Sequence, residues 1–122
     1  MKKWFLMLSL VFASILVLSG CGEEATSKEP AASTGEVKEF TIKASNFEFD
    51  QKEIKVNKGD TVKITLENTQ GLHALEVAGY DVEVKDGETI TFVASETGEF
   101  EYICSIMCGT GHNDMIGSLV VQ

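Results

Sequence analysis

Four side chains that could bind a soft metal follow one another near the end of the chain. Cys104, Cys108, His112 and Met115 recur at intervals of four, four and three residues. Thiolate, imidazole and thioether groups together suit copper. The sequence has only two histidines and three cysteines, and the other histidine, His73, lies upstream. Because the scarce metal-binding residues gather here, the sequence predicts a copper site.

Two other uses of these residues stay open on the sequence alone. Cys104 and Cys108 could form a disulfide bond, but it would close a very short loop and contribute little loop entropy. The two cysteines and the two histidines could also form a closed tetrahedral zinc site. A disulfide leaves both histidines without a shared role, and zinc does not need Met115. Copper is the interpretation that uses all of these side chains.

The second thiolate bears on the number of copper ions. A mononuclear blue-copper site needs one thiolate, two imidazoles and a weak axial thioether, and would leave Cys108 unused. Two thiolates about 4 Å apart repel each other by about 4 kcal/mol at a surface-like dielectric. Two copper ions bridged by both sulfurs would remove that repulsion, and each ion would take one histidine. The sequence therefore favours two ions over one.

The segments around this loop have the pattern of short β-strands. Apolar and polar residues alternate, and clusters of Asn, Asp and Gly separate the segments. The predicted strands are 40–44, 54–56, 61–66, 72–77, 82–84, 89–93, 100–103 and 116–121. No segment has a helical period, so the fold class is all-β, an antiparallel sandwich or barrel. Since a strand precedes Cys104 and another follows Met115, the sheet would hold both ends of the loop.

The N-terminal part of the chain reads as a targeting segment. Lys2 and Lys3 precede an apolar stretch, 4–17, that is short for a membrane-spanning helix. Leu18-Ser19-Gly20-Cys21 resembles the lipobox of bacterial lipoproteins, which implies cleavage before Cys21 and a lipid on it; an uncleaved signal anchor is the alternative. The polar, small-residue stretch that follows is typical of a flexible tether. The predicted organisation is a signal peptide (1–20), a lipidated tether (21–36) and a folded domain (37–122).

The charge of the chain excludes one class of partner. The formal net charge is -9, with 19 acidic residues against 10 basic ones. All the basic residues are lysines and form no basic stripe, so nucleic-acid binding is disfavoured. An acidic surface suits a cationic protein partner, or simply solubility.

Several segments of the domain resemble the cupredoxins. Residues 56–62 look like the early strand-turn-strand of that family, and 98–104 like the strand that carries its copper cysteine. The loop 104–115 has the C-x3-C-x3-H-x2-M pattern of the binuclear CuA centre of cytochrome c oxidase subunit II and of nitrous oxide reductase. Residues 116–121 are similar to the last strand of oxidase subunit II. The resemblance implies a cupredoxin-like Greek-key β-sandwich.

The resemblance also implies a function and a set of ligands. The chain would carry single electrons, without bond chemistry of its own, at the extracytoplasmic face of the cell membrane. Its partners would be cytochrome c or a membrane respiratory complex, and a copper-insertion protein is plausible. Copper storage or delivery, and membership of a small terminal oxidase, stay open. The implied ligands of two copper ions are bridging Cys104 and Cys108, terminal His73 and His112, the Met115 thioether and the Ile106 main-chain carbonyl.

Two features depart from the pattern of oxidase subunits. Ile106 stands where those subunits often have an acidic or amide side chain, so it offers a carbonyl but no side-chain oxygen. The only tryptophan is Trp4, in the predicted signal peptide, so the predicted domain lacks an exposed tryptophan for accepting electrons.

Overall fold

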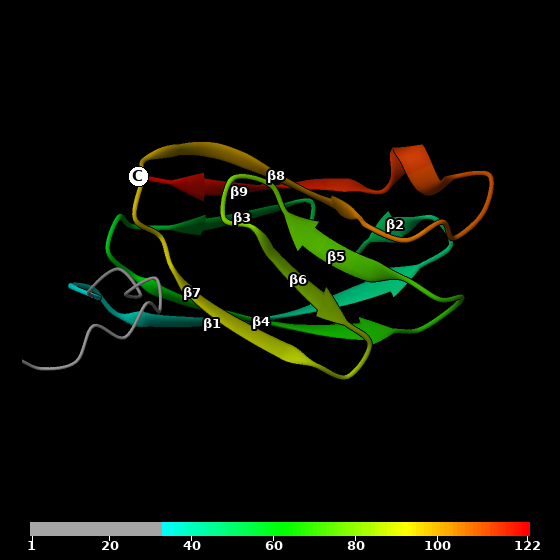
Figure 1. Ribbon diagram of the computed structural model, residues 1–122, viewed down its shortest axis with the longest axis horizontal. Coiled ribbons are helices and arrows are strands. Elements are labelled where there is room, and N and C mark those ends of the chain that lie inside the picture. Colours follow the sequence, from blue (N-terminus) through cyan, green and yellow to red (C-terminus); the bar gives the residue numbers. More distant parts are fainter. Residues whose placement is uncertain (1–32) are drawn as a thin grey trace, which may run out of the picture.

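The computed structural model describes residues 33–122, which form two β-sheets packed face to face (Figure 1). The first sheet contains, in order, β2 (Glu48–Phe49), β1 (Val37–Ser45), β4 (Thr61–Asn68) and β7 (Thr89–Val93). The second contains, in order, β3 (Glu53–Val56), β9 (Ile116–Val121), β8 (Gly98–Cys104), β5 (Ala74–Val77) and β6 (Val82–Lys85). The predicted all-β sandwich is confirmed. Only β2 was not predicted, because two residues are too few to show an alternation.

Both sheets are mixed rather than wholly antiparallel. β1 runs parallel to β4, with Val37 opposite Thr61, and β3 runs parallel to β9. The other strand pairs are antiparallel. Side chains alternate with the same period in parallel and antiparallel ladders, so the sequence pattern could not distinguish these two pairings. Several connections cross from one sheet to the other, which gathers the loops at the two ends of the sandwich.

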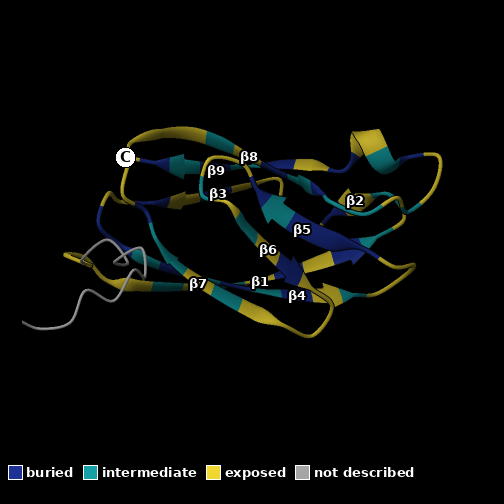
Figure 2. Ribbon diagram, viewed as in Figure 1, coloured by how far each residue is buried: buried dark blue, intermediate teal, exposed yellow. Residues whose placement is uncertain are grey.

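The core lies between the sheets and sets the distance between them. Along β4, Val62, Ile64 and Leu66 are buried, and the residues between them are more exposed. Leu75 and Leu119 meet them from the second sheet and are also fully buried. Figure 2 shows the buried segments along the facing strands. Each such side chain contributes about 1.5–3 kcal/mol on burial, so the sandwich is a firm support for its loops.

The loops form two ends that we name by what they carry. The cysteine pole consists of 46–47, 69–73 and 105–115, and includes the one helical element of the described residues, the 3₁₀ turn η1 (His112–Asp114). The distal pole consists of 57–60, 94–97 and the chain end. Figure 1 shows the two poles at opposite ends of the strands. Among the described residues, no helix has the length and apolar character needed to cross a membrane.

The residues just before β1 pack against the distal pole. The main-chain N–H of Gly35 donates to the carbonyl of Gly59 (3.0 Å), and that of Glu36 donates to the carboxylate of Asp60 (2.9 Å). The sequence assigns Gly35 and Glu36 to the tether, yet both are hydrogen-bonded to the domain. The predicted signal peptide and lipidated Cys21 lie outside the described residues.

Candidate metal centre

Strands β8 and β9 hold the two ends of the 105–115 loop side by side. The strands are antiparallel neighbours, and their register brings Ile103 opposite Ile116. One step further along, the N–H of Cys104 donates to the carbonyl of Met115 at 3.2 Å. The loop therefore leaves the sheet and returns to it at adjacent positions. This closure places Cys104 and Met115 next to each other without any metal.

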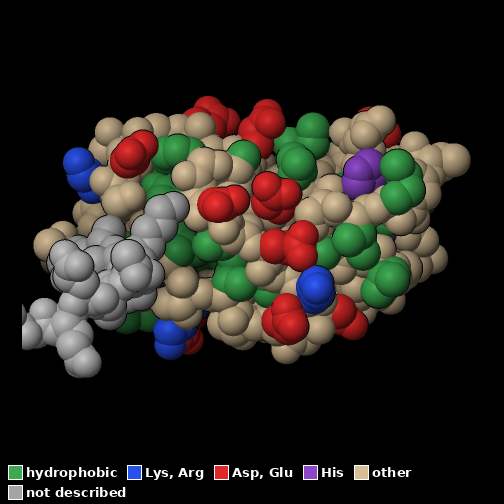
Figure 3. All heavy atoms as spheres, viewed as in Figure 1, with side chains coloured by type: hydrophobic (Ala, Val, Ile, Leu, Met, Phe, Trp, Pro, Cys, Tyr) green, Lys and Arg blue, Asp and Glu red, His purple; other side chains and the backbone are tan. Residues whose placement is uncertain are grey.

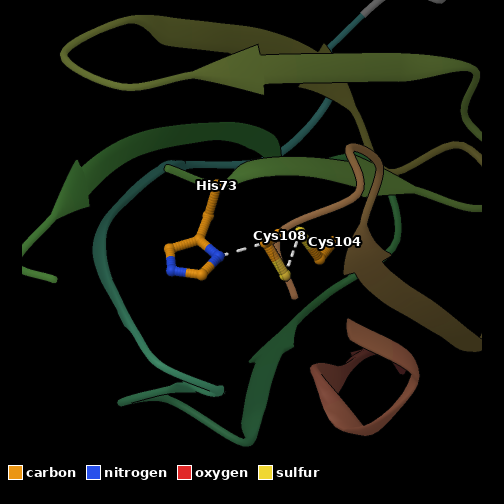
Figure 4. Close-up of side chains that lie close together, drawn as sticks. All are labelled: His73, Cys104 and Cys108. Atoms are coloured by element: carbon orange, nitrogen blue, oxygen red, sulfur yellow. Dashed lines mark hydrogen bonds between the residues drawn. The ribbon is translucent and has the colours of Figure 1, made fainter. Parts of the chain in front are cut away.

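Each of the two loop cysteines faces a different histidine. The Sγ atoms of Cys104 and Cys108 lie 3.6 Å apart and both thiols are free, whereas a disulfide bond is about 2.05 Å long. The Sγ of Cys104 is 3.9 Å from Nδ1 of His73. The Sγ of Cys108 is 3.7 Å from Nδ1 of His112. Figure 4 shows the His73 ring directed at the cysteine pair.

Two further donors complete the surroundings of the sulfurs. The main-chain carbonyl oxygen of Ile106 lies 3.2 Å from Sγ of Cys104. The thioether sulfur of Met115 lies 3.6 Å from Sγ of Cys108. The structure thus brings together all six residues that the resemblance implied as ligands, and assigns one extra donor to each cysteine.

The site has a buried inner half and a more accessible outer half. The inner half is His73 and Cys104, whose side chains are 1% and 3% exposed. The outer half is Cys108 and His112, which are both partly exposed. The ligand atoms of His73, Cys104 and Cys108 all lie within 4.8 Å of one another, and His112 approaches this group from the Cys108 side. His73 therefore contacts the sulfur of Cys104, and His112 contacts that of Cys108.

A main-chain carbonyl fixes the orientation of His73. The Nε2 atom of His73 lies 2.8 Å from the carbonyl oxygen of Gln70. A carbonyl can only accept, so Nε2 carries the proton and the lone pair of Nδ1 faces Cys104. Gly71 permits this approach, because a Cβ there would lie 2.8 Å from Nε2. Asn68 holds the same segment by donating from Nδ2 to the carbonyl of His73 (3.1 Å). Sequence reasoning missed these residues, since a carbonyl leaves no side-chain signal.

Phe47 supports the cysteine loop from the β1–β2 turn. A Cβ added to Gly109 would lie 2.8 Å from the ring of Phe47, and one added to Gly111 would overlap it still more closely. The loop backbone therefore lies directly on the ring. The two glycines were the available signal in the sequence, but nothing there names the aromatic residue that they accommodate.

The surroundings of Cys108 favour its protonated thiol. Burial raises the pKa of Cys108 above its ordinary value, and the hydrogen bond with Cys104 raises it further. A thiolate is the metal-binding form, so a metal ion must displace this proton when it binds. Two thiols, two imidazoles, a thioether and a carbonyl are a set that copper can use, whereas zinc has no need of a thioether. The donor set therefore fits copper.

Comparisons with known proteins find relatives in sequence. The chain is 31% identical over 85 residues to cytochrome c oxidase subunit 2 of Thermus thermophilus, covering 66% of this chain and 63% of the relative. It is 33% identical over 82 residues to nitrous-oxide reductase of Stutzerimonas stutzeri, covering 61% of this chain and 13% of the relative. The chain thus spans less than two thirds of either relative. No protein-family profile matches the sequence.

The solved structures show the same fold. The periplasmic domain of subunit II of cytochrome oxidase from Bradyrhizobium japonicum superposes with a TM-score of 0.62 at 16% identity, covering 69% of this chain and 83% of that one. The fold is that of the cupredoxins, and the site brings together donors that suit copper. Its sequence is similar to that of cytochrome c oxidase subunit II over 85 residues.

Proposed function

We propose that this chain is a lipid-anchored electron carrier whose centre holds two copper ions in a CuA-like arrangement. The observation that carries the proposal is the pairing at the site. The sulfurs of Cys104 and Cys108 are adjacent, and each faces its own imidazole. Each sulfur also has its own extra donor, from Ile106 or Met115. Two half-sites that share two sulfurs match the needs of two ions.

The same pairing argues against the other uses of these residues. A mononuclear site would use one thiolate and leave the other without a role, whereas each of the two sulfurs here has an imidazole beside it. Copper storage or delivery would need donors that release their cargo readily. His73 and Cys104 are almost fully buried, as is Met115, so release would require the loop to open.

The protein's contribution to electron transfer is a rigid and largely dry setting. Bound copper would supply a one-electron redox couple. The Gln70 carbonyl holds the His73 ring in one tautomer, and the sheet holds both ends of the cysteine loop. Ligands that are positioned before the metal arrives need to move little when its charge changes. The chain itself would perform no bond chemistry, and any oxidase activity would belong to a complex that contains it.

The proposed location is the extracytoplasmic face of the cell membrane, with a lipid on Cys21. The described chain starts at the distal pole, so an anchored domain would direct its cysteine pole away from the attachment point. One of the named relatives is an oxidase subunit, which favours cytochrome c or a membrane respiratory complex as the redox partner. Replacing Cys21 with Ala should block lipidation and signal cleavage together. Recovery of the unaltered chain in the soluble fraction, without lipid, would exclude the anchor.

Copper analysis of the full chain tests the proposed centre. The reduced chain is loaded with copper, freed of unbound metal and analysed for copper, zinc and protein. The expected result is two copper ions per chain and an electron spin resonance spectrum split equally by two copper nuclei. One tightly bound copper ion, or a preference for zinc when both metals are offered, would reject the binuclear centre.

A further inference from the structure

The cysteine loop carries four sulfur atoms whose exposure decreases in steps. Met107 is 81% exposed, Cys108 is partly exposed, Cys104 is 3% exposed and Met115 is fully buried. The sequence has four methionines, and the two within the described residues are both on this loop. Met115 is one of the implied ligands. Met107 has no role in the proposed centre, although its thioether is as soft a donor as that of Met115.

Packing does not explain a methionine at position 107. Met107 is more exposed than the other large apolar side chains on the described surface, Val37, Leu72 and Ile116. So exposed a side chain contributes little to the core, and its flexible thioether lies in solvent. Its place in the chain is directly before Cys108, the more accessible of the two thiols.

The sulfur of Cys108 lies between the other donors of the site. It lies 3.6 Å from the sulfur of Cys104, 3.6 Å from that of Met115 and 3.7 Å from Nδ1 of His112. An ion held at Cys108 is therefore next to three other donors, and the remaining two, His73 and the Ile106 carbonyl, follow through Cys104. Copper that reaches Cys108 can move inward by exchanging one ligand at a time.

We propose that the thioether of Met107 is the entry ligand that captures incoming Cu(I) and passes it to Cys108. This inference rests on the proposed copper function, and Cu(I) is here the cargo. The Met107 sulfur donates a lone pair to the ion. It displaces one ligand of the carrier, the molecule that brings the copper ion, with no proton or electron transferred. The Cys108 thiol then gives its proton to water, and its thiolate replaces the remaining carrier ligand. A donor beside Cys108, His112 or Met115, then takes the place of Met107, and the copper stays Cu(I) throughout.

The negative charge of the chain favours the approach of a cation. The formal net charge of the chain is -9. Figure 3 shows acidic side chains over the middle of one face, with a histidine and apolar side chains nearer one end. A negative field raises the local concentration of a cation and speeds its arrival. Capture by a neutral thioether then holds the ion without a preceding deprotonation.

A cavity of about 190 Å³ is the competing entrance. It is lined by Ile103, Cys104, His112, Asn113, Met115 and Ile116. It reaches the buried donors Cys104 and Met115, and of its more exposed lining residues only His112 is a donor of the proposed centre. The two routes differ in which residue controls the rate of loading.

The test is the rate of Cu(I) uptake by the full chain, reduced and kept without oxygen. The probe is Cu(I) bound to the chromogenic chelator bicinchoninate, whose colour reports transfer. Met107→Leu keeps the apolar volume and removes the sulfur, and should slow uptake by about tenfold, equivalent to about 1.4 kcal/mol of activation free energy. Leu72→Ala, an exposed position without a donor, is the matched control and should leave the rate unchanged. Ile116→Phe narrows the cavity and should also leave it unchanged.

The endpoint separates this inference from the proposed function. Met107→Leu should reach the same final copper content and the same spectrum as the unaltered chain, only later. An unchanged uptake rate in Met107→Leu would overturn the capture role, and slowing in Ile116→Phe alone would assign entry to the cavity. Failure of the unaltered chain to retain copper would instead reject the copper centre itself.

Discussion

The two poles of the sandwich differ in the contacts that their polar groups make. At the distal pole, the carboxylate of Asp60 accepts from the N–H of Asn57 and from that of Glu36, both at 2.9 Å. The N–H of Gly59 donates to the carbonyl of Ala94 at 2.8 Å, which ties this turn to the next loop. At the cysteine pole, the sulfurs and imidazoles meet one another at 3.6–3.9 Å. The polar groups of the distal pole are hydrogen-bonded to one another, whereas the sulfurs and imidazoles of the cysteine pole are directed at a common position.

This difference separates stability from metal binding. Short hydrogen bonds at the distal pole contribute to folding whether or not metal is present. The weak contacts among thiols and imidazoles contribute little, because sulfur is a poor donor and acceptor. We therefore expect changes at the distal pole to alter unfolding and leave copper content intact. Changes among the ligands should do the reverse, and a residue that supports the loop should affect both.

The largest expected effect comes from Cys108→Ser, which removes the sulfur that lies beside three other donors of the site. Copper content should fall from two ions per chain to one, because the remaining donors form a mononuclear set. The electron spin resonance signal should change from splitting by two nuclei to splitting by one. Unfolding of the copper-free chain should hardly change. Cys21→Ser is the matched control and should keep both ions, whereas an unaltered spectrum in Cys108→Ser would show that this sulfur is not a bridge.

The next largest effect is expected for Gly111→Ala, which tests the support that Phe47 gives to the cysteine loop. The added Cβ would overlap the ring of Phe47. Overpacking of this kind costs about 1–3 kcal/mol of unfolding free energy, and the displaced loop should also bind copper more weakly. Chemical unfolding and copper competition measure the two effects.

A matched glycine and a compensating change sharpen this test. Gly87 has a positive φ, +74°, which Gly111 does not have, and an added Cβ at Gly87 meets nothing within 4 Å. Gly87→Ala should therefore reduce stability through backbone strain alone and leave copper affinity unchanged. Combining Gly111→Ala with Phe47→Leu should restore part of the copper affinity. If affinity stays low in the double variant, the ring of Phe47 is not what the glycine accommodates.

Asp60→Asn should affect only the distal pole. The N–H of Asn57, followed by that of Glu36, lowers the pKa of the Asp60 carboxyl group. A lowered pKa means that its contribution is present above the ordinary carboxyl pKa of about 3.9 and is lost as the pH falls below it. Asp60→Asn should lower the melting temperature of the copper-free chain at pH 7 and reduce its further fall on acidification. Glu39→Gln, at an exposed ion pair with Lys63, is the control. A changed copper spectrum in Asp60→Asn would contradict the separation of the poles.

The sequence predicted the candidate ligands of the cysteine pole far better than the residues that hold those ligands in place. Cys104, Cys108 and His112 belong to residue types that are rare in this chain, so their spacing was informative. The strands followed from alternation, which reports burial on one face. Alternation carries no information on strand direction, so the parallel pairing of β1 with β4 was not predictable. The roles of Phe47 and of the Gln70 carbonyl depend on segments that meet only in the folded chain.

The smallest expected effect concerns Tyr102, a buried residue of β8 two positions before Cys104. Its hydroxyl donates to the carbonyl of Gln51 at 2.5 Å, and its ring packs edge-on against Phe49 at a centroid distance of 5.6 Å. Removing the hydroxyl in Tyr102→Phe keeps the ring and should cost about 0.5–1.5 kcal/mol of unfolding free energy at pH 7. The copper spectrum should not change, because the ring that supports β8 stays in place.

Alkaline pH gives this last prediction a second, independent readout. Burial, followed by the nearby carboxylates of Asp50 and Glu53, raises the pKa of Tyr102 to about 12. The unfolded value is about 10, so the folded state holds this proton more tightly and its contribution is complete below pH 10. That contribution is lost as the pH rises from about 10 to 12. The unaltered chain should therefore lose stability over this range, and Tyr102→Phe should lose less. Tyr80→Phe, at a less buried tyrosine, is the control, and equal losses in all three chains would show that Tyr102 does not couple folding to its ionisation.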